Sequence, residues 1–127
     1  MFAAHISTDM KREQSVIEHC RNTAELCAGY CKLFGAENIG RLSGLLHDIG
    51  KLCTDFDNYI RGTSGFSRGE VDHSYAGAKY ITGNTDKARS GVARLIARVI
   101  ISHHGIHDWV DENCRDYFHI RIANDKN

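Results

Sequence analysis

The stretch Leu45-Leu46-His47-Asp48-Ile49-Gly50-Lys51 marks a place where a buried helix ends in chemically active side chains. The two leucines are typical of the buried face of a helix, and Gly50 ends that helix directly after the polar pair. An imidazole and a carboxylate are both good ligands for a metal ion. A His-Asp pair by itself occurs often by chance, and the apolar helix around this one is what makes it informative.

On both sides of this stretch, apolar residues recur every three or four positions, which predicts helices. We expect helices over residues 10–34, 38–52, 54–61, 73–81, 87–104 and 107–120. Glycines separate several of these segments, and Asp72 is expected to cap the helix that starts at His73. No segment alternates apolar and polar residues over a useful length. The sequence therefore predicts an all-α helical bundle.

The length of 127 residues suits one compact domain, and we expect a single domain over residues 1–127. Sixteen basic residues balance sixteen acidic ones, so bulk charge does not indicate nucleic-acid binding. Such binding would need bound metal ions or a local basic patch. The candidates for that patch, which can equally form a solvated helix face, are Arg61, Arg68, Arg89, Arg94 and Arg98.

Nothing in the sequence predicts a membrane span or a secretory signal, so we expect a cytoplasmic protein. The best apolar stretch, residues 95–101, is interrupted by Arg98 and is far shorter than a span requires. The five cysteines are an odd number, which argues against a disulfide framework. The helical spacing of Cys20, Cys27 and Cys31 favours core packing, with a zinc site as the alternative.

Eight histidines are many for a neutral chain of this length. Taken singly, His19 can be a core residue satisfied by a hydrogen bond, and His73 a surface residue in a capped first turn. His103 and His104 can be cations favoured at the C-terminus of a helix. A shared metal site explains all of them with one cause. The remaining histidines are interpreted as surface or local structure: His5, His107 and His119.

The predicted metal ligands lie on inward helix faces or at helix ends: His19, His47, Asp48, His73, His103 and His104. Neutral imidazole and carboxylate ligands suit first-row transition metals. Six ligands exceed what one tetrahedral ion needs. We therefore expect one or two divalent metal ions (Mn, Fe, Co, Ni, Zn or Mg), and two ions would be bridged by Asp48.

The order His, His-Asp, His, His-His along a helical chain resembles the HD superfamily of metal-dependent phosphohydrolases. Within it, the chain is most similar to the HD nuclease domain of the CRISPR-associated helicase-nuclease of type I interference systems. The resemblance covers about residues 2–107. It rests on Phe2-Ala3-Ala4-His5, Arg12-Glu13-Gln14, Glu18-His19, residues 46–51 with Phe56, Tyr59-Ile60 and Gly62, Asp72-His73-Ser74 with Gly77-Ala78, and residues 101–105.

The resemblance implies an HD-domain fold and a division of the ligands between two ions. One ion would be held by His19, His47 and Asp48 with a further aspartate downstream. The other would be held by the ligands Asp48, His73, His103 and His104. Asp48 and Lys51 would be catalytic residues, with Lys51 near the scissile phosphate.

The resemblance further implies endonuclease-type hydrolysis of single-stranded DNA in antiviral defence. The implied partners are a helicase domain and the CRISPR interference complex. The family's last aspartate normally lies on a later helix, well beyond the histidine pair. This chain ends 23 residues after His104, and its late aspartates match no such context, so we expect the domain to be incomplete at its C-terminal end. Those late aspartates are Asp108, Asp111, Asp116 and Asp125.

Two other functions use the same ligands. The first is an HD phosphohydrolase that acts on a nucleotide or a cyclic dinucleotide. The second is a metal-binding or protein-interaction domain with impaired catalysis, which the unmatched final aspartate favours.

Overall fold

The computed structural model of the chain describes residues 1–67 and 70–105 together with Phe118. In this part the fold is mostly helical, as predicted. The elements follow in the order β1 (Ala3–Ile6), β2 (Glu13–Ser15), α1 (Val16–Cys31), η1 (Lys32–Phe34), α2 (Glu37–Leu46), η2 (Ile49–Lys51), α3 (Thr54–Ile60), α4 (Ala76–Gly83), η3 (Lys87–Arg89) and α5 (Ser90–Ile101), where η denotes a 3-10 helix.

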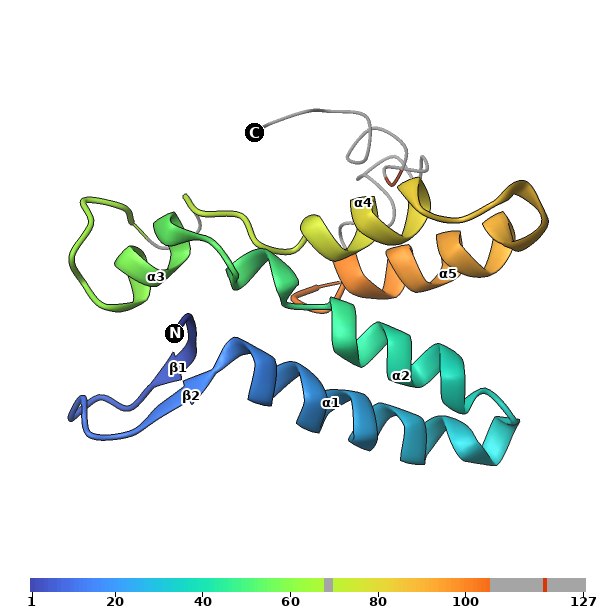
Figure 1. The fold of residues 1–127 in the computed structure, drawn as a ribbon, viewed down its shortest axis with the longest axis horizontal. Helices are drawn as coiled ribbons and strands as arrows, with labels where there is room; N and C mark the ends of the chain where they lie inside the picture. Colours follow the sequence, from blue (N-terminus) through green and yellow to red (C-terminus); the bar gives the residue numbers. More distant parts are fainter. Residues whose placement is uncertain (68–69, 106–117, 119–127) are drawn as a thin grey trace.

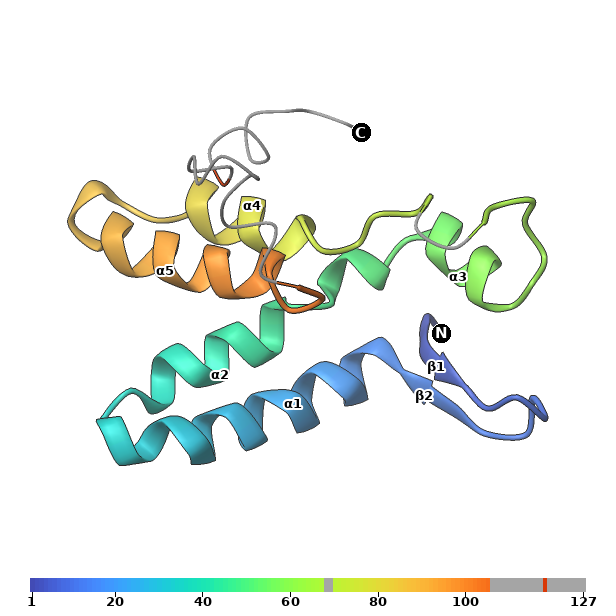
Figure 2. The ribbon, with the colours of Figure 1, turned by 180° about the vertical axis from the view of Figure 1, so that it is seen from behind.

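Two helical hairpins form the body of the molecule (Figure 1). Helices α1 and α2 make one antiparallel pair, α4 and α5 make the other, and α2 contacts α5. The view from behind in Figure 2 shows α2 between α1 and α5. Fully buried side chains of α5, including Ile96 and Ile100, pack with Ala78 of α4 and with Ile39 and Leu46 of α2. This shared core holds the two hairpins together.

A short β-hairpin precedes α1, and the prediction of a helix from residue 10 was wrong there. Strands β1 and β2 pair antiparallel, and α1 begins only at Val16. The Ser15 hydroxyl caps the helix by accepting a hydrogen bond from the backbone N–H of Glu18, at 3.2 Å. A paired strand of three residues is too short to show a period-two pattern, so the sequence carries no strand signal.

Helix α2 ends at Leu46, earlier than the expected helix over residues 38–52. The chain turns at His47 and Asp48 and resumes as the short η2. A Cβ atom on Gly50 would overlap the backbone carbonyl of His73, so only glycine fits at this approach. The turn places Asp48 at the junction of the two helical hairpins, where it is buried.

Helix α4 also begins later than predicted, at Ala76. The Asp72 carboxylate accepts hydrogen bonds from the Ser74 backbone N–H and hydroxyl at 2.9 and 2.7 Å, so it closes a local turn instead of capping a helix. His73 lies within that turn. Gly77 lets α4 approach α2, because a Cβ atom there would overlap the Leu46 carbonyl.

The later predicted helices are confirmed in part. Helix α3 matches the expected one over residues 54–61 closely. The segment expected as one helix over residues 87–104 is η3 followed by α5, which ends at Ile101, so His103 and His104 follow the helix. The helix expected over residues 107–120 lies outside the described residues except for Phe118, which is buried.

The four cysteines in the described part of the chain are all free. Cys20 is buried, whereas Cys27 and Cys31 are half-buried. Within the described residues no cysteine joins a group of three metal-competent side chains, so core packing describes these cysteines better than a zinc site. Cys114 lies outside the described residues. None of the described helices combines the length and apolarity that crossing a bilayer requires.

Candidate metal centre

The structure brings all six predicted ligands together around the carboxylate of Asp48. His19 comes from the first turn of α1, and His47 and Asp48 follow the last turn of α2. His73 comes from the turn before α4, and His103 and His104 follow α5. Each of the two helical hairpins therefore contributes imidazoles to the same carboxylate.

One oxygen of Asp48 faces the first helical hairpin. Its Oδ2 atom lies 3.1 Å from Nε2 of His19 and 3.3 Å from Nε2 of His47. The two Nε2 atoms are themselves 3.1 Å apart. We call this group the Oδ2 half-site.

The other oxygen of Asp48 faces the second helical hairpin. Its Oδ1 atom lies 3.5 Å from Nε2 of His73 and 3.4 Å from Nε2 of His103. Nε2 of His104 is 2.8 Å from that of His73, which completes a group of four side chains that could hold a metal ion. We call this group the Oδ1 half-site. His104 is exposed, so this half-site opens towards solvent.

Backbone carbonyls orient two of the rings. The Nδ1–H of His47 donates to the Gly44 carbonyl at 2.8 Å, and the Nδ1–H of His103 donates to the Ile100 carbonyl at 2.5 Å. In the neutral rings the lone pair is then on Nε2, which faces Asp48. Metal-binding histidines in proteins are held in this way by a second partner.

The arrangement of donors fits a divalent cation. Oδ1 of Asp48 and Nε2 of His103 are both buried, and neither has a hydrogen-bond partner within the described residues. A carboxylate oxygen and an imidazole lone pair are both hydrogen-bond acceptors. Because they face each other here, a cation or a proton must lie between them. Two nitrogens each about 2.1 Å from one ion lie about 3.4 Å apart in a tetrahedral site and about 3 Å apart in an octahedral one. The two Nε2 pairs, at 3.1 and 2.8 Å, are closer to the octahedral separation.

Lys51 already supplies one positive charge to the centre. Its buried ammonium group lies 2.8 Å from Oδ2 of Asp48 and 5.3 Å from the centroid of the Phe56 ring. The charge is therefore on the Oδ2 side of the carboxylate. Because a second cation there would be repelled by the ammonium group, the Oδ1 half-site is the more favourable position for a first metal ion.

The electrostatics of the site suit metal binding near neutral pH. Burial acts to raise the pKa of Asp48, but His103, His47 and Lys51 outweigh it and hold that pKa far below its usual range. Burial, opposed by Asp48, lowers the pKa of His73 to about 4. Burial also lowers the pKa of His19 and, together with His103, that of His104. The pKa of His47 is raised, because contact with Asp48 outweighs the effect of burial.

His5 is a neighbour of the centre that the sequence interpretation missed. Its ring lies edge-on to that of His19, with 4.7 Å between the ring centroids. Burial and the charge of Lys51 lower the pKa of His5. Its position in the segment Phe2-Ala3-Ala4-His5, part of the family resemblance, was the one signal that could have marked it.

Other candidate residues do not join the cluster. Arg61 forms ion pairs with Glu13 and Asp57, and Arg98 lies 4.9 Å from the centroid of the Phe118 ring. Arg89 and Arg94 lie on η3 and α5. The candidates that fall outside the described residues are Arg68, His107, Asp108, Asp111, Asp116, His119 and Asp125.

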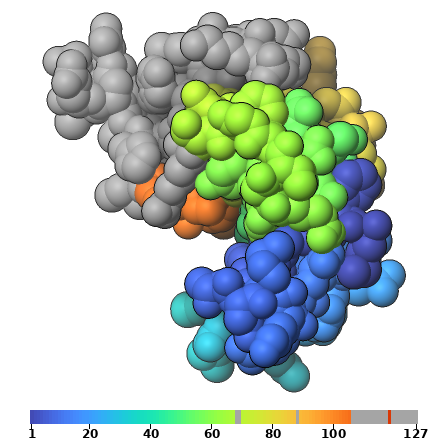
Figure 3. Space-filling view, turned by 90° about the vertical axis from the view of Figure 1, so that its left-hand side faces the viewer, coloured from blue at the N-terminus to red at the C-terminus, as the bar shows by residue number. Residues whose placement is uncertain are grey.

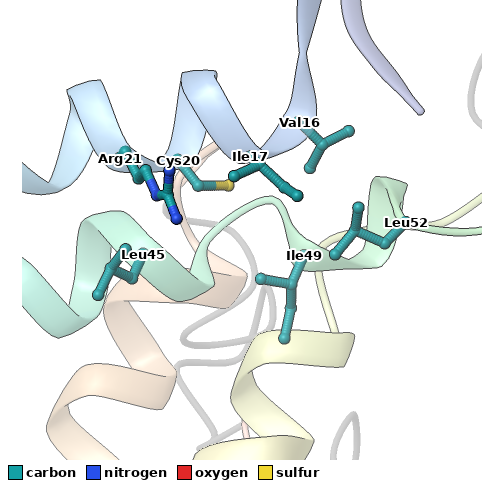
Figure 4. Close-up of a pocket in the computed structure, with 7 residues that line it drawn as sticks. All are labelled: Val16, Ile17, Cys20, Arg21, Leu45, Ile49 and Leu52. Atoms are coloured by element: carbon teal, nitrogen blue, oxygen red, sulfur yellow. The ribbon is translucent and has the colours of Figure 1, made fainter. Parts of the chain in front are cut away.

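An apolar pocket of about 160 Å³ lies between α1 and the α2–η2 segment (Figure 4). None of the six predicted ligands lines it, and Arg21 is the one charged residue in its lining. Apart from Cys20 and Arg21 its lining is aliphatic, so the pocket holds no cluster of side chains for acid–base or metal chemistry. The lining residues are Val16, Ile17, Cys20, Arg21, Leu45, Ile49 and Leu52.

Comparison with known proteins identifies the family. The sequence profile of the HD domain matches residues 16–120, a span that includes all six predicted ligands. A comparison with curated proteins found no similar sequence. The match extends over most of the chain, and it agrees with the helical fold and with the His/Asp cluster. The chain thus belongs to the HD domain family of metal-dependent phosphohydrolases.

Proposed function

We propose that this domain hydrolyses phosphodiester bonds in single-stranded DNA with the aid of one or two divalent metal ions. The observation that carries the proposal is the division of five imidazoles between the two oxygens of one buried carboxylate. The preference for DNA rests on the segments that resemble the CRISPR-associated nuclease domain. In that setting a helicase domain and the interference complex are the proposed partners.

The residues of the Oδ1 half-site would hold the first ion: Asp48, His73, His103 and His104. A divalent cation held there supplies Lewis acidity, which activates water and neutralises charge on phosphoryl oxygens. The exposed imidazole of His104 marks the side from which a phosphate on a polymer can approach. His19 and His47 would hold a second ion, or support Asp48 through hydrogen bonds when a single ion is bound.

Asp48 and Lys51 would act as a pair. The ammonium group of Lys51 offsets the carboxylate charge, which keeps Asp48 ionised in a buried position. Near a phosphate, the same ammonium group would add an electrostatic attraction to the developing negative charge. Because Lys51 is buried, this attraction acts over a short distance within the site.

The test begins with metal content. The purified protein is assayed by elemental analysis and then incubated with Mn²⁺, Ni²⁺, Co²⁺, Fe²⁺ or Zn²⁺ and a circular single-stranded DNA. We expect about one to two ions per chain and linearisation of the circle. Asp48→Asn should abolish both metal retention and cleavage. Asp55→Asn is the matched control, because Asp55 is an exposed carboxylate of α3.

Three results would count against the proposal in different ways. Turnover of nucleotides or cyclic dinucleotides without DNA cleavage would support the metal centre but show that the proposed substrate is wrong. Retention of metal with no turnover of any phosphate ester would indicate a metal-binding or interaction domain. Cleavage by Asp48→Asn at the wild-type rate would reject the centre itself.

A further inference from the structure

We propose that His5 contacts the substrate, by donating a hydrogen bond to a phosphoryl oxygen bound beside the Oδ2 half-site. This inference rests on the proposed function, and it concerns a residue that precedes the matched HD region. Its basis is the position of one exposed imidazole next to the metal centre, held there by the β-hairpin.

An irregularity in strand pairing directs the side chains of β1. The pairing passes from Ala3 opposite Ser15 to His5 opposite Gln14, which leaves Ala4 as an extra residue on β1. Ala3 and Ala4 are both buried, an arrangement that a regular strand does not allow because successive side chains alternate. A bulge of this kind turns the following side chain, and here that side chain is His5.

Arg61 fixes the position of this strand against α3. Its guanidinium donates to Asp57 at 3.0 Å, to Glu13 on β2 at 2.7 and 3.1 Å, and to the Met1 carbonyl at 3.3 Å. The other Asp57 oxygen accepts from the backbone N–H of Ala3 at 3.0 Å. In Figure 3 the dark blue N-terminal residues lie against the green residues of this region. The hairpin is therefore tied at both strands, close to His5.

His5 lies beside the metal ligands without being one of them. In the described part of the chain, the groups whose ligand atoms all lie within 4.8 Å of one another include His19, His47 and Asp48 but not His5. The ring of His5 meets that of His19 edge-on and the residue is exposed. The imidazole of His5 can therefore be reached by a molecule that enters from solvent.

The chemistry of the surroundings favours a phosphoryl oxygen as the acceptor. An imidazole carries at least one N–H donor in either protonation state. A phosphate bound at the Oδ2 half-site would bring several anionic oxygens next to His19, the ring that His5 contacts. A hydrogen bond from a ring N–H to such an oxygen is charge-assisted, and the contact is strong enough to affect substrate binding.

Two variants separate substrate contact from simple packing. His5→Phe keeps an aromatic ring against His19 but lacks the donor, whereas His5→Gln keeps an N–H donor and loses the ring. The exposed hairpin residue Thr8 provides a control, Thr8→Ala. The readouts are Mn²⁺ affinity by calorimetry, ³¹P line broadening of inorganic phosphate by the Mn²⁺-loaded protein, and KM and kcat for DNA cleavage.

We expect His5→Phe to keep the wild-type Mn²⁺ affinity and to weaken phosphate binding and raise KM about tenfold, the effect of losing one charge-assisted hydrogen bond. His5→Gln should restore part of the phosphate broadening. Thr8→Ala should match wild type throughout. Wild-type broadening and KM in His5→Phe would overturn the inference, as would a loss of Mn²⁺ affinity equal to that of His19→Ala, which would make His5 a ligand.

The outcome also separates this inference from the proposed function. Phosphate broadening that depends on His5, in a protein that cleaves no DNA, would support the contact and reject the nuclease activity. DNA cleavage with unchanged KM and broadening in His5→Phe would reject the contact alone. Absence of phosphate broadening in the Mn²⁺-loaded wild-type protein would also overturn the contact.

Discussion

The ammonium group of Lys51 lies 2.8 Å from the Oδ2 atom of Asp48, and the side chains are only 7% and 3% exposed. One oxygen of the carboxylate is thus paired with a fixed cation, while the other, Oδ1, has no hydrogen-bond partner among the described residues. The two halves of the centre therefore differ in charge before any metal binds.

Removal of the Lys51 charge should change both stability and metal stoichiometry. Lys51→Met leaves the buried carboxylate without its ammonium partner, which should lower the free energy of unfolding of the metal-free protein by about 3 kcal/mol. The same change removes the repulsion at the Oδ2 half-site, so a second ion should bind more tightly. Chemical denaturation and calorimetric titration with Mn²⁺ measure the two effects.

Lys87→Met on the exposed η3 is the control for this variant, and it should change stability by less than about 0.5 kcal/mol. A second ion that binds no better in Lys51→Met than in the wild type would contradict the charge argument.

Loss of single histidines should distinguish the two half-sites. His104→Ala removes a proposed ligand of the Oδ1 half-site. Loss of a residue that only hydrogen-bonds a metal ligand typically lowers metal affinity tenfold to hundredfold, or about 1–3 kcal/mol. The affinity for the first ion should fall by more than this. His19→Ala should leave the first ion bound and abolish the second. Equal losses in the two variants, measured by elemental analysis after dialysis, would mean that the ions are not bound independently.

Metal binding should weaken in acid, and the Oδ2 half-site should be affected first. The pKa of His47 is raised, so this ring holds its proton to a higher pH than usual, and a metal ion must displace that proton. Affinity therefore rises with pH through the pKa of His47. The pKa of His73 is about 4, so His73 is already neutral well below pH 6. When the pH is lowered from 7.5 to 5.5, the second ion should dissociate before the first.

The two glycines of α4 should respond differently to substitution by alanine. Gly77→Ala places a Cβ atom against the Leu46 carbonyl, so the free energy of unfolding should fall by about 1–3 kcal/mol. A Cβ on the exposed Gly83 meets nothing within 4 Å, so Gly83→Ala should be neutral or stabilising by up to about 1 kcal/mol. Thermal melts of the pair compare the two directly, and equal shifts would rule out the close contact of α4 with α2.

The helices and the convergence of the ligands could be predicted because both follow from local patterns. A buried face shows itself every three or four residues, and glycines mark where a helix stops. His47 and Asp48 lie next to such a stop, as do His103 and His104 before Gly105. The positions of helix ends, by contrast, depend on contacts between distant residues, such as the approach of Gly50 to His73.

The β-hairpin and the contact of His5 with His19 could not be predicted from local patterns for the same reason. The strands are three and four residues long, and the contacts that hold them come from Asp57 and Arg61, more than forty residues later. A short polar segment gives no sign of a partner so far along the chain. Asp72 was misread as a helix cap because its hydrogen bonds to Ser74 close a turn that the sequence pattern does not distinguish from a first helical turn.

The location of Asp48 at the junction of the two helical hairpins has a mechanical consequence. An ion bound to His73, His103 and His104 through this carboxylate would cross-link the two helical hairpins, which share a hydrophobic core. Chelation should then release α4 and α5 as a unit and speed amide hydrogen exchange there more than in α1. The local stability of α4 and α5 would therefore depend on the concentration of free metal ion.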